Sequence, residues 1–407
     1  MCFEIYDKSL CRRERTSVLK KKLTVISILL ILLLALTAVL IICSELGSDE
    51  KPSSTPRLNA GRKWNIAYLQ SGENSHNVQI LKALVDGLAR LGWLKPVNWG
   101  GLAKNADSRQ CWNYISNNIS SDYLVFAKDA YWSSEWQNSQ RHHNRQEILS
   151  RLNDAKDIDL LIAIGTWSGQ DMATNLHKVP VLVISSINPK AAGIIRDGEQ
   201  GLQHIFAKYD PDMIARQIRM FHLLTGFKKL GVVHDPSDST RLYGNIEDLK
   251  SAAAEKKFEL IIKTVSYNSL PPAESAKVFY KAYEELSREA DAIWVTAIVD
   301  SAYLPEIMKS MHKNKIPTWS PYGERFVEAG VLFSVRTFPA ENAADYAEAI
   351  AMIFNGVLPR DINPLMSNRY ELIINHATAK TIDYKIPRGL LFATDNNYLT
   401  FKAKEKK

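Results

Sequence analysis

Short, fully apolar segments alternate with amphipathic helical segments from residue 64 onward. The segment 158–164 reads IDLLIAI and precedes a helical stretch at 168–176. A strand without polar alternation is buried on both faces, so this pattern predicts a parallel sheet with helices on either side. In the first half we expect strands at 64–69, 123–126, 158–164 and 181–184, and helices at 78–91, 146–153 and 168–176.

The alternation restarts at Pro211 and predicts a second unit of similar size. Its expected helices are 211–224, 242–255, 273–287, 304–312 and 340–354, and its expected strands are 230–233, 258–265, 292–296, 317–319 and 331–335. A chain of 407 residues exceeds the size of a single core. The predicted fold class is therefore α/β, with two doubly wound parallel-sheet lobes and a cleft between them.

Residues 94–145 fit the alternation poorly and are expected to elaborate the first lobe. They contain Trp99, Trp112, Trp132 and Trp136 and the pair His142-His143. Adjacent residues of a helix point to different sides, so the histidine pair favours a solvated face over a metal site.

An uncharged run of 21 residues, Leu23–Cys43, lies near the N-terminus. As a helix it would span the hydrocarbon core of a membrane. Three lysines precede it and acidic residues follow it, which predicts a single-pass anchor in the inner (cytoplasmic) membrane with the C-terminal part in the periplasm or outside the cell. A cleaved signal peptide is the alternative, and a lipoprotein signal is disfavoured because Ile42 precedes Cys43. We expect a basic cytoplasmic tail at 1–22, the anchor at 23–43 and a flexible stalk at 44–62.

The net charge of +7 comes from the two ends of the chain. Residues 1–22 hold seven basic and three acidic side chains, and residues 401–407 hold four basic and one acidic. The body between them is neutral, so the sequence argues against nucleic acid as a partner. Cys111 is the one cysteine after the predicted anchor and is expected to be a buried apolar residue.

Ligands of open α/β sheets bind beyond the carboxyl ends of the strands. The loops there are rich in Ser, Thr and Asn, which can hold a carboxylate or hydroxyl but also commonly cap helices. Trp167 and Tyr322 could provide a stacking wall. The candidate ligand-binding residues are Ser71, Asn74, Thr166, Trp167, Ser186, Asn188, Ser239, Thr240, Asp300 and Tyr322.

Catalytic signatures are weak. The run 165–169 places Trp167 where a nucleophile elbow needs serine, and no phosphate loop is found in the sequence. No catalytic residue, metal or cofactor is predicted.

Four stretches resemble the ABC transporter substrate-binding proteins of the type I periplasmic binding fold, in particular the tryptophan- and tyrosine-binding branch. They are WNIAYLQSGENSHNVQILKALVDGLARLGW (64–93), DLLIAIGTWSGQDM (159–172) with VPVLVISSINPKAAGI (179–194), IPTWSPYGERFVEAGVLFSV (316–335) and ELIINHATAKTIDYKIPRGLL (371–391). In the second of these stretches Asn188 stands where the family usually has an aspartate. Three further features depart from the family pattern: the region 94–145 is longer and more aromatic than is usual, the glycine expected soon after Val335 is missing, and the anchor lacks a lipobox.

The resemblance implies two lobes joined by three crossovers that close on a small ligand. Lobe 1 would comprise 63–205 and 336–365, and lobe 2 would comprise 206–335 and 366–400. It also implies a solute-binding protein that captures a small polar or amphipathic molecule such as an amino acid. Separate ABC permease and ATPase subunits would be its partners.

Two alternatives stay open. A sensory or assembly ectodomain would bind a protein partner instead. An enzyme on this fold would bring His234, Asp235 or Asp300 together in the cleft.

Overall fold

The first lobe is built on a five-stranded parallel sheet with the order β2-β1-β3-β4-β5. The computed structural model describes residues 53–74, 76–186, 188–196, 198, 201–236, 245–266, 270–296, 303–337, 339–365, 370–391 and 397–398. The strands are β1 (Trp64–Gln70), β2 (Leu124–Ser133), β3 (Leu160–Ile164), β4 (Val181–Ile184) and β5 (Ile205–Ala207). β3, β4 and β5 are buried along their whole length, as expected for strands covered on both faces.

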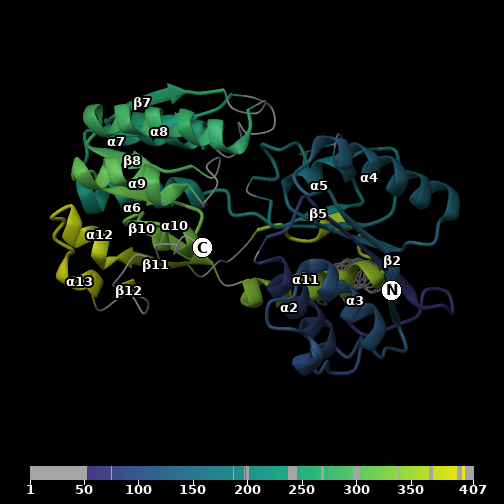
Figure 1. The fold of residues 1–407 in the computed structure, drawn as a ribbon. Helices are drawn as coiled ribbons and strands as arrows, with labels where there is room; N and C mark the ends of the chain where they lie inside the picture. Colours follow the sequence, from purple (N-terminus) through teal and green to yellow (C-terminus); the bar gives the residue numbers. More distant parts are fainter. Residues whose placement is uncertain are drawn as a thin grey trace, which may run out of the picture. The chain divides into compact units, whose positions relative to one another are not determined.

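Helices cover both faces of this sheet. The core on one face contains residues from α2 (Asn77–Arg90), α3 (Ser108–Asn118) and α11 (Pro339–Phe354). The core on the other face contains residues from α4 (Asn138–Ser150), α5 (Thr166–Met172) and the segment 194–207. α11 lies beside α2 although more than 240 residues separate them in the chain (Figure 1). Its Ala347 and Ile350 are fully buried in the same core as Leu84 and Leu88 of α2.

The second lobe is built on a seven-stranded sheet with the order β12-β11-β10-β9-β8-β6-β7. Its strands are β6 (Lys229–His234), β7 (Glu259–Thr264), β8 (Ala292–Trp294), β9 (Thr318–Ser320), β10 (Phe333–Thr337), β11 (Tyr370–Asn375) and β12 (Asn397–Tyr398). Its helices are α6 (Met213–Thr225), α7 (Ile246–Lys256), α8 (Pro272–Glu289), α9 (Leu304–Lys313), α10 (Glu324–Glu328), α12 (His376–Thr381) and α13 (Arg388–Leu391). α6 and α7 pack on one face, and α8, α9 and α10 on the other.

The structure confirms two α/β lobes with largely parallel sheets and corrects the expected pattern in one respect. β11 runs antiparallel to β10, with Phe333 opposite Ile374 and Thr337 opposite Tyr370. The segment contains no long apolar run, so its direction cannot be read from hydrophobicity. β12 pairs parallel with β11, so these two strands run opposite to the other five and the second sheet is mixed.

Residues 94–145 belong to the alternation after all. They contain α3 and the whole of β2, which is longer than the expected strand at 123–126, and they begin α4. Trp112 is fully buried, and its Nε1 donates to the carbonyl oxygen of Ala127 at 3.0 Å. Polar residues Lys128 and Asp129 interrupt the apolar pattern of β2, which is why the sequence did not indicate its full length. His142 and His143 are exposed, and Cys111 is buried, both as predicted.

The expected stalk at 44–62 differs from the structure in its described part. Trp93 Nε1 donates to Ser54 O at 3.0 Å, and Asn355 Nδ2 donates to Thr55 O at 3.1 Å. Arg62 forms a two-pronged ion pair with Asp159, with both contacts at 2.6 Å. Residues 54–62 are therefore attached to the first lobe.

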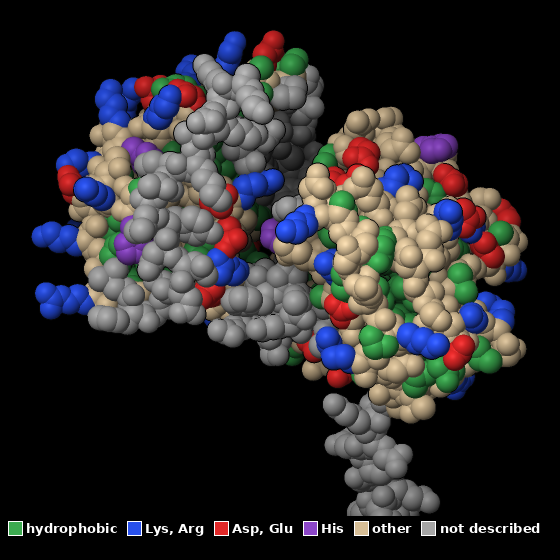
Figure 2. Space-filling model, turned by 60° about the horizontal axis from the view of Figure 1, so that its bottom comes forward, with side chains coloured by type: hydrophobic (Ala, Val, Ile, Leu, Met, Phe, Trp, Pro, Cys, Tyr) green, Lys and Arg blue, Asp and Glu red, His purple; other side chains and the backbone are tan. Residues whose placement is uncertain are grey.

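The charged surface agrees with the neutral body seen in the sequence. On the face shown in Figure 2, described Lys and Arg side chains are interspersed with Asp and Glu. The predicted anchor at 23–43 lies outside the described residues. Among the residues that are described, no helix has the length and hydropathy needed to span a membrane.

Two buried histidines of the first lobe lie against each other. His177 and His204 are 3% and 4% exposed, and their ring centroids lie 4.6 Å apart. Burial lowers the pKa of both, and the neighbouring His177 helps to lower the pKa of His204 to about 4. Both rings are therefore neutral in the folded protein at pH 7.

This pair predicts a loss of stability in mild acid. The unfolded chain binds protons with a pKa near 6.5, above the folded values, so the contribution is complete above about pH 6.5 and is lost as the pH falls toward 4. We expect His204→Gln to reduce the fall in unfolding free energy between pH 7 and pH 5 by about 1–2 kcal/mol, measured by urea denaturation. His143→Gln, an exposed control, should leave the pH dependence unchanged, and an equal change in both variants would contradict the prediction.

Candidate functional site

The candidate site begins where β1 and β3 end side by side. β1 pairs with β2 on one side and with β3 on the other. The chain therefore adds β2 on one side of β1 and then crosses over to add β3 on the other side, so the strand order reverses at this point. Such a switch point leaves a crevice at the carboxyl ends of the two strands. Ser71 follows β1 directly. Its backbone N–H donates at 2.9 Å to the carbonyl oxygen of Ile164, which is the last residue of β3.

Ser71 and Ser168 meet where these two strands end. Ser71 is 1% exposed, and its Oγ shares a hydrogen bond of 3.3 Å with Ser168 Oγ. Ser71 Oγ also accepts from Ser168 N at 3.2 Å. Gly165 allows this approach, because it has φ +96° and a Cβ on it would lie 2.4 Å from Ser71 Oγ. The loop after β1 is therefore held directly against the start of α5.

A buried amide network fixes the rest of the loop after β1. Gln70 is fully buried, and its Oε1 accepts from Tyr68 OH at 2.8 Å and from Asn77 Nδ2 at 2.9 Å. Its Nε2 donates to Glu73 Oε2 and Ser133 Oγ, both at 3.1 Å. Burial raises the pKa of Tyr68, so its hydroxyl stays protonated and remains a donor.

Aromatic side chains form one wall beside the crevice. The rings of Trp136 and Trp167 meet edge to face with centroids 5.8 Å apart. Trp136 lies over Gly72, where a Cβ would come within 2.3 Å of the indole nitrogen. Its backbone N–H donates to Ser71 O at 3.0 Å, and it is 49% exposed. We call Trp136 and Trp167 the aromatic corner.

An ion pair supports the aromatic corner from the side of α4. The Arg141 guanidinium lies 4.9 Å from the ring centroid of Trp167. Its Nε donates to both oxygens of Asp171, at 3.0 and 2.9 Å. Burial raises the pKa of Asp171 while Arg141 opposes that shift. Because Asp171 belongs to α5, this pair ties α4 to the helix that carries both Trp167 and Ser168.

Four further predicted residues lie in the segments that follow β1, β3 and β4. Thr166 is 4% exposed, and its Oγ1 shares a hydrogen bond of 3.4 Å with Ser186 Oγ. Asn188 Oδ1 accepts from Ala191 N at 3.0 Å, a local hydrogen bond of the kind by which Asn side chains commonly cap the following turn. Asn74 is exposed, and its Oδ1 accepts from His76 N at 3.0 Å.

Tyr322 is the predicted residue of the second lobe that the structure describes. It is half-buried, and its hydroxyl donates to Asn245 Oδ1 at 3.3 Å. Trp294 Nε1 donates to the same oxygen at 3.3 Å. Ser239, Thr240 and Asp300 lie outside the described residues. The enzyme alternative expects His234, Asp235 and Asp300 to converge. Because Asp300 lies outside the described residues, the structure does not test this convergence.

The structure brings together Ser71, Thr166, Trp167 and Ser186 and adds groups that sequence reasoning missed. The missed residues are Gln70, Asn77, Ser168, Trp136, Arg141 and Asp171. Ser168 was visible as the residue after Trp167, whereas no local signal links Arg141 to Asp171, which lie 30 residues apart. Within the described residues, no group of three or more His, Cys, Asp or Glu could hold a metal ion.

The close contact at Gly165 gives a stability prediction with a matched control. Gly165→Ala places a Cβ 2.4 Å from Ser71 Oγ and 2.9 Å from Ser71 Cβ, whereas Gly356 has a similar φ of +95° and nothing within 4 Å. Both substitutions carry backbone strain, and Gly165→Ala adds an overpacking cost of about 1–3 kcal/mol. Equal losses of unfolding free energy in the two variants, measured by urea denaturation, would contradict this account.

Comparison with known proteins agrees with the two-lobe architecture. A family model described as "ABC transporter substrate binding protein" matches residues 128–397. A tyrosine-binding protein of Clostridioides difficile (strain R20291) is 25% identical over 255 residues, which cover 61% of this chain and 70% of that protein.

Solved structures show the same fold. One is a domain from Streptococcus pneumonia in complex with L-Trp, with a TM-score of 0.58 and 20% identity, covering 82% of this chain and 99% of that one. Another is a ligand-free, open substrate-binding protein with adhesive properties from Clostridium difficile, with a TM-score of 0.57 and 18% identity, covering 83% and 100%. The family consists of substrate-binding proteins rather than enzymes, and they act in the periplasm or outside the cell. With two α/β lobes and a family match over most of its described length, the chain belongs to the ABC transporter substrate-binding proteins.

Proposed function

We propose that this protein captures an amino-acid-like molecule between its two lobes for uptake by an ABC transporter. The aromatic corner beside the Ser71–Ser168 hydroxyl pair is the observation that carries the proposal. Indole rings bind an apolar or aromatic side chain, while hydroxyls and backbone amides bind a carboxylate. The Clostridioides difficile relative is named for tyrosine and the Streptococcus domain was solved with L-Trp, which favours an aromatic amino acid as the ligand.

The proposed ligand contacts extend to both lobes. In the first lobe they are Ser71, Asn74, Thr166, Trp167, Ser186 and Asn188. In the second lobe they are Ser239, Thr240, Asp300 and Tyr322. A ligand that touches both groups binds the closed form more tightly than the open one, and this difference in affinity drives closure. No step of this cycle needs a catalytic group.

We further propose that residues 23–43 anchor the protein in the cytoplasmic membrane. The uncharged run, three preceding lysines and following acidic residues support this placement. One membrane helix cannot form a transport pathway, so separate permease and ATPase subunits would complete the system.

Isothermal titration of the full chain in detergent against the amino acids tests the proposal. We expect saturable binding that is tightest for an aromatic amino acid. Absence of saturable binding across the panel would overturn amino acid capture. Binding of an aliphatic amino acid alone would overturn the role assigned to the aromatic corner.

A tryptophan pair provides a matched test of the aromatic corner. Trp167→Ala removes the ring that faces Trp136, whereas Trp99→Ala removes another half-buried indole of the first lobe, next to Tyr114. We expect Trp167→Ala to weaken ligand binding by at least tenfold, because a stacked aromatic contact and its buried area are lost. Trp99→Ala should keep the affinity of the wild type, and equal weakening in both would count against the proposed site.

A further inference from the structure

The two described sheets end in four edge strands, and three of these are protected against pairing with another chain. The register of β2 against β1 shifts between Phe126 and Tyr131, and the exposed Lys128 and Asp129 lie at this irregularity. Bulges and charged side chains both prevent an edge strand from accepting a further strand. β12, at one edge of the second sheet, has two residues, which offer few groups for pairing.

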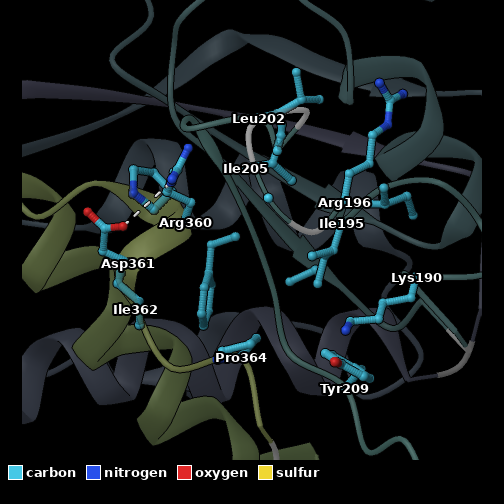
Figure 3. A pocket seen from close by; sticks show the side chains of 16 residues that line it. Lys190, Ile195, Arg196, Leu202, Ile205, Tyr209, Arg360, Asp361, Ile362 and Pro364 are labelled. Atoms are coloured by element: carbon cyan, nitrogen blue, oxygen red, sulfur yellow. Dashed lines mark ion pairs between the residues drawn. The ribbon is translucent and has the colours of Figure 1, made fainter.

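The edge of β5 is covered by the segment after α11, which includes the turn η5 (Pro359–Asp361). Arg360 N donates to Gln203 O at 3.2 Å before β5, and Tyr209 N donates to Pro364 O at 2.9 Å after it. Figure 3 shows Arg360, Pro364 and Tyr209 around the pocket that this segment forms beside β5. A strand of another chain could add here only by displacing the segment.

β7 lacks these protections within the part of the chain that the structure describes. It pairs with β6 without a register shift, from Glu259 opposite Lys229 to Thr264 opposite His234. Figure 1 shows its other side at the outer margin of the second lobe. All of its residues are at least partly exposed, and Ile262 is 36% exposed. A regular strand with an exposed isoleucine at its centre is an edge that can accept a further strand.

The backbone of β7 directs hydrogen-bonding groups to its outer side. Glu259 N donates to Lys228 O at 2.8 Å, and Val265 N donates to His234 O at 2.9 Å. Because the backbone groups of successive strand residues point to opposite sides, odd-numbered residues bond to β6 and even-numbered residues point their N–H and C=O groups outward. The outward-pointing residues are Leu260, Ile262 and Thr264.

A second copy of β7 complements the first in one antiparallel register. With Ile261 opposite itself on a two-fold axis, Leu260 of each copy lies opposite Ile262 of the other, so outward-pointing backbone groups meet. Glu259 of each copy then lies opposite Lys263 of the other, in pairs whose side chains are close. An axis at Glu259 or Lys263 would bring like charges together. An axis at Leu260 or Ile262 would place one of the charges opposite Ile261.

This register adds to the existing ion pairs without breaking them. Lys263 Nζ lies 2.9 Å from Glu289 and 3.5 Å from Glu285, both on α8, and Glu259 lies 3.8 Å from Lys229. A lysine ammonium has three donors, so Lys263 can accept Glu259 of the second copy as a further neighbour. Its contacts with α8 also draw the ammonium toward the helix, where it does not block the outer backbone edge of β7.

We propose that β7 is a dimerisation edge that pairs antiparallel with β7 of a second copy of this chain, with Ile261 on the two-fold axis. Such a contact consists of one strand pair with two reciprocal ion pairs, which is small for a protein interface. We therefore expect a dissociation constant on the order of 10–100 µM. The proposal does not depend on amino acid capture, because no residue of the candidate site belongs to β7.

Complementary charge reversals test the register. Glu259→Lys and Lys263→Glu each place like charges in both cross-strand pairs of a homodimer, whereas the heterodimer of the two variants restores two opposite pairs. By sedimentation equilibrium of the full chain in detergent, we expect each variant alone to dimerise at least about tenfold more weakly than the wild type. An equimolar mixture should return to within about threefold of the wild-type affinity.

The gain on mixing is the decisive readout, because each reversal also changes ion pairs within its own chain. A folding defect in either variant would persist in the mixture, whereas a restored cross-strand pair appears only there. A mixture that dimerises no better than the separate variants would overturn the proposal. A wild-type chain that stays monomeric up to about 1 mM would overturn it too.

A proline substitution tests the outer backbone edge. Ile262→Pro removes an N–H that points away from β6, a position at which an edge strand accepts proline. We expect it to abolish the dimer while circular dichroism shows the wild-type fold. Ile262→Thr keeps the N–H and the β-branched shape, so it should dimerise within about threefold of the wild type. Equal dimerisation of the folded proline and threonine variants would contradict strand pairing at β7.

Discussion

The parallel pairing of β1 with β3 positions the groups of the candidate site in the first lobe. Gln70 lies opposite Ile164, so the two strands end together and their following loops meet. The pairing continues for one more step, because Ser71 N donates to Ile164 O at 2.9 Å. β3 is buried on both faces and β1 is buried over its last five residues, which fixes the register strongly. The meeting of Ser71 with Ser168 is therefore a consequence of core packing.

Buried polar groups then determine how rigidly the loop after β1 is held against Ser168. Gln70 is fully buried, and both ends of its amide are satisfied by the side chains of Tyr68, Asn77, Glu73 and Ser133. A buried amide with missing partners would be costly, so this network opposes rearrangement of the loop. A loop that is already ordered loses less conformational entropy when a ligand binds. The network would thus favour affinity at the proposed site without contacting the ligand.

The apolar strands made most of the architecture predictable, because burial on both faces leaves a clear signal in segments such as 160–164. The direction of β11 and the length of β2 carry no comparable signal, since both depend on pairing with distant strands. In the candidate site, Ser71, Thr166, Trp167 and Ser186 follow from their position after strands. Arg141 and Asp171 could not be predicted as a pair, because only the packing of α4 against α5 brings them together.

Trp136 of the proposed site is held by a short segment that is independent of the sheet. Glu135 and Trp136 both have positive φ values, +47° and +56°, in the left-handed region that is unfavourable for residues other than glycine. The surrounding contacts hold them there: Trp136 N donates to Ser71 O, and Gln137 N donates to Ser134 O at 2.7 Å. This short segment between β2 and α4 lays an indole over the loop after β1 without contributing to the sheet. A substitution in it would alter the wall of the proposed site while the β1–β3 register and the buried amide network stay in place, so on this proposal specificity and fold depend on separate residues.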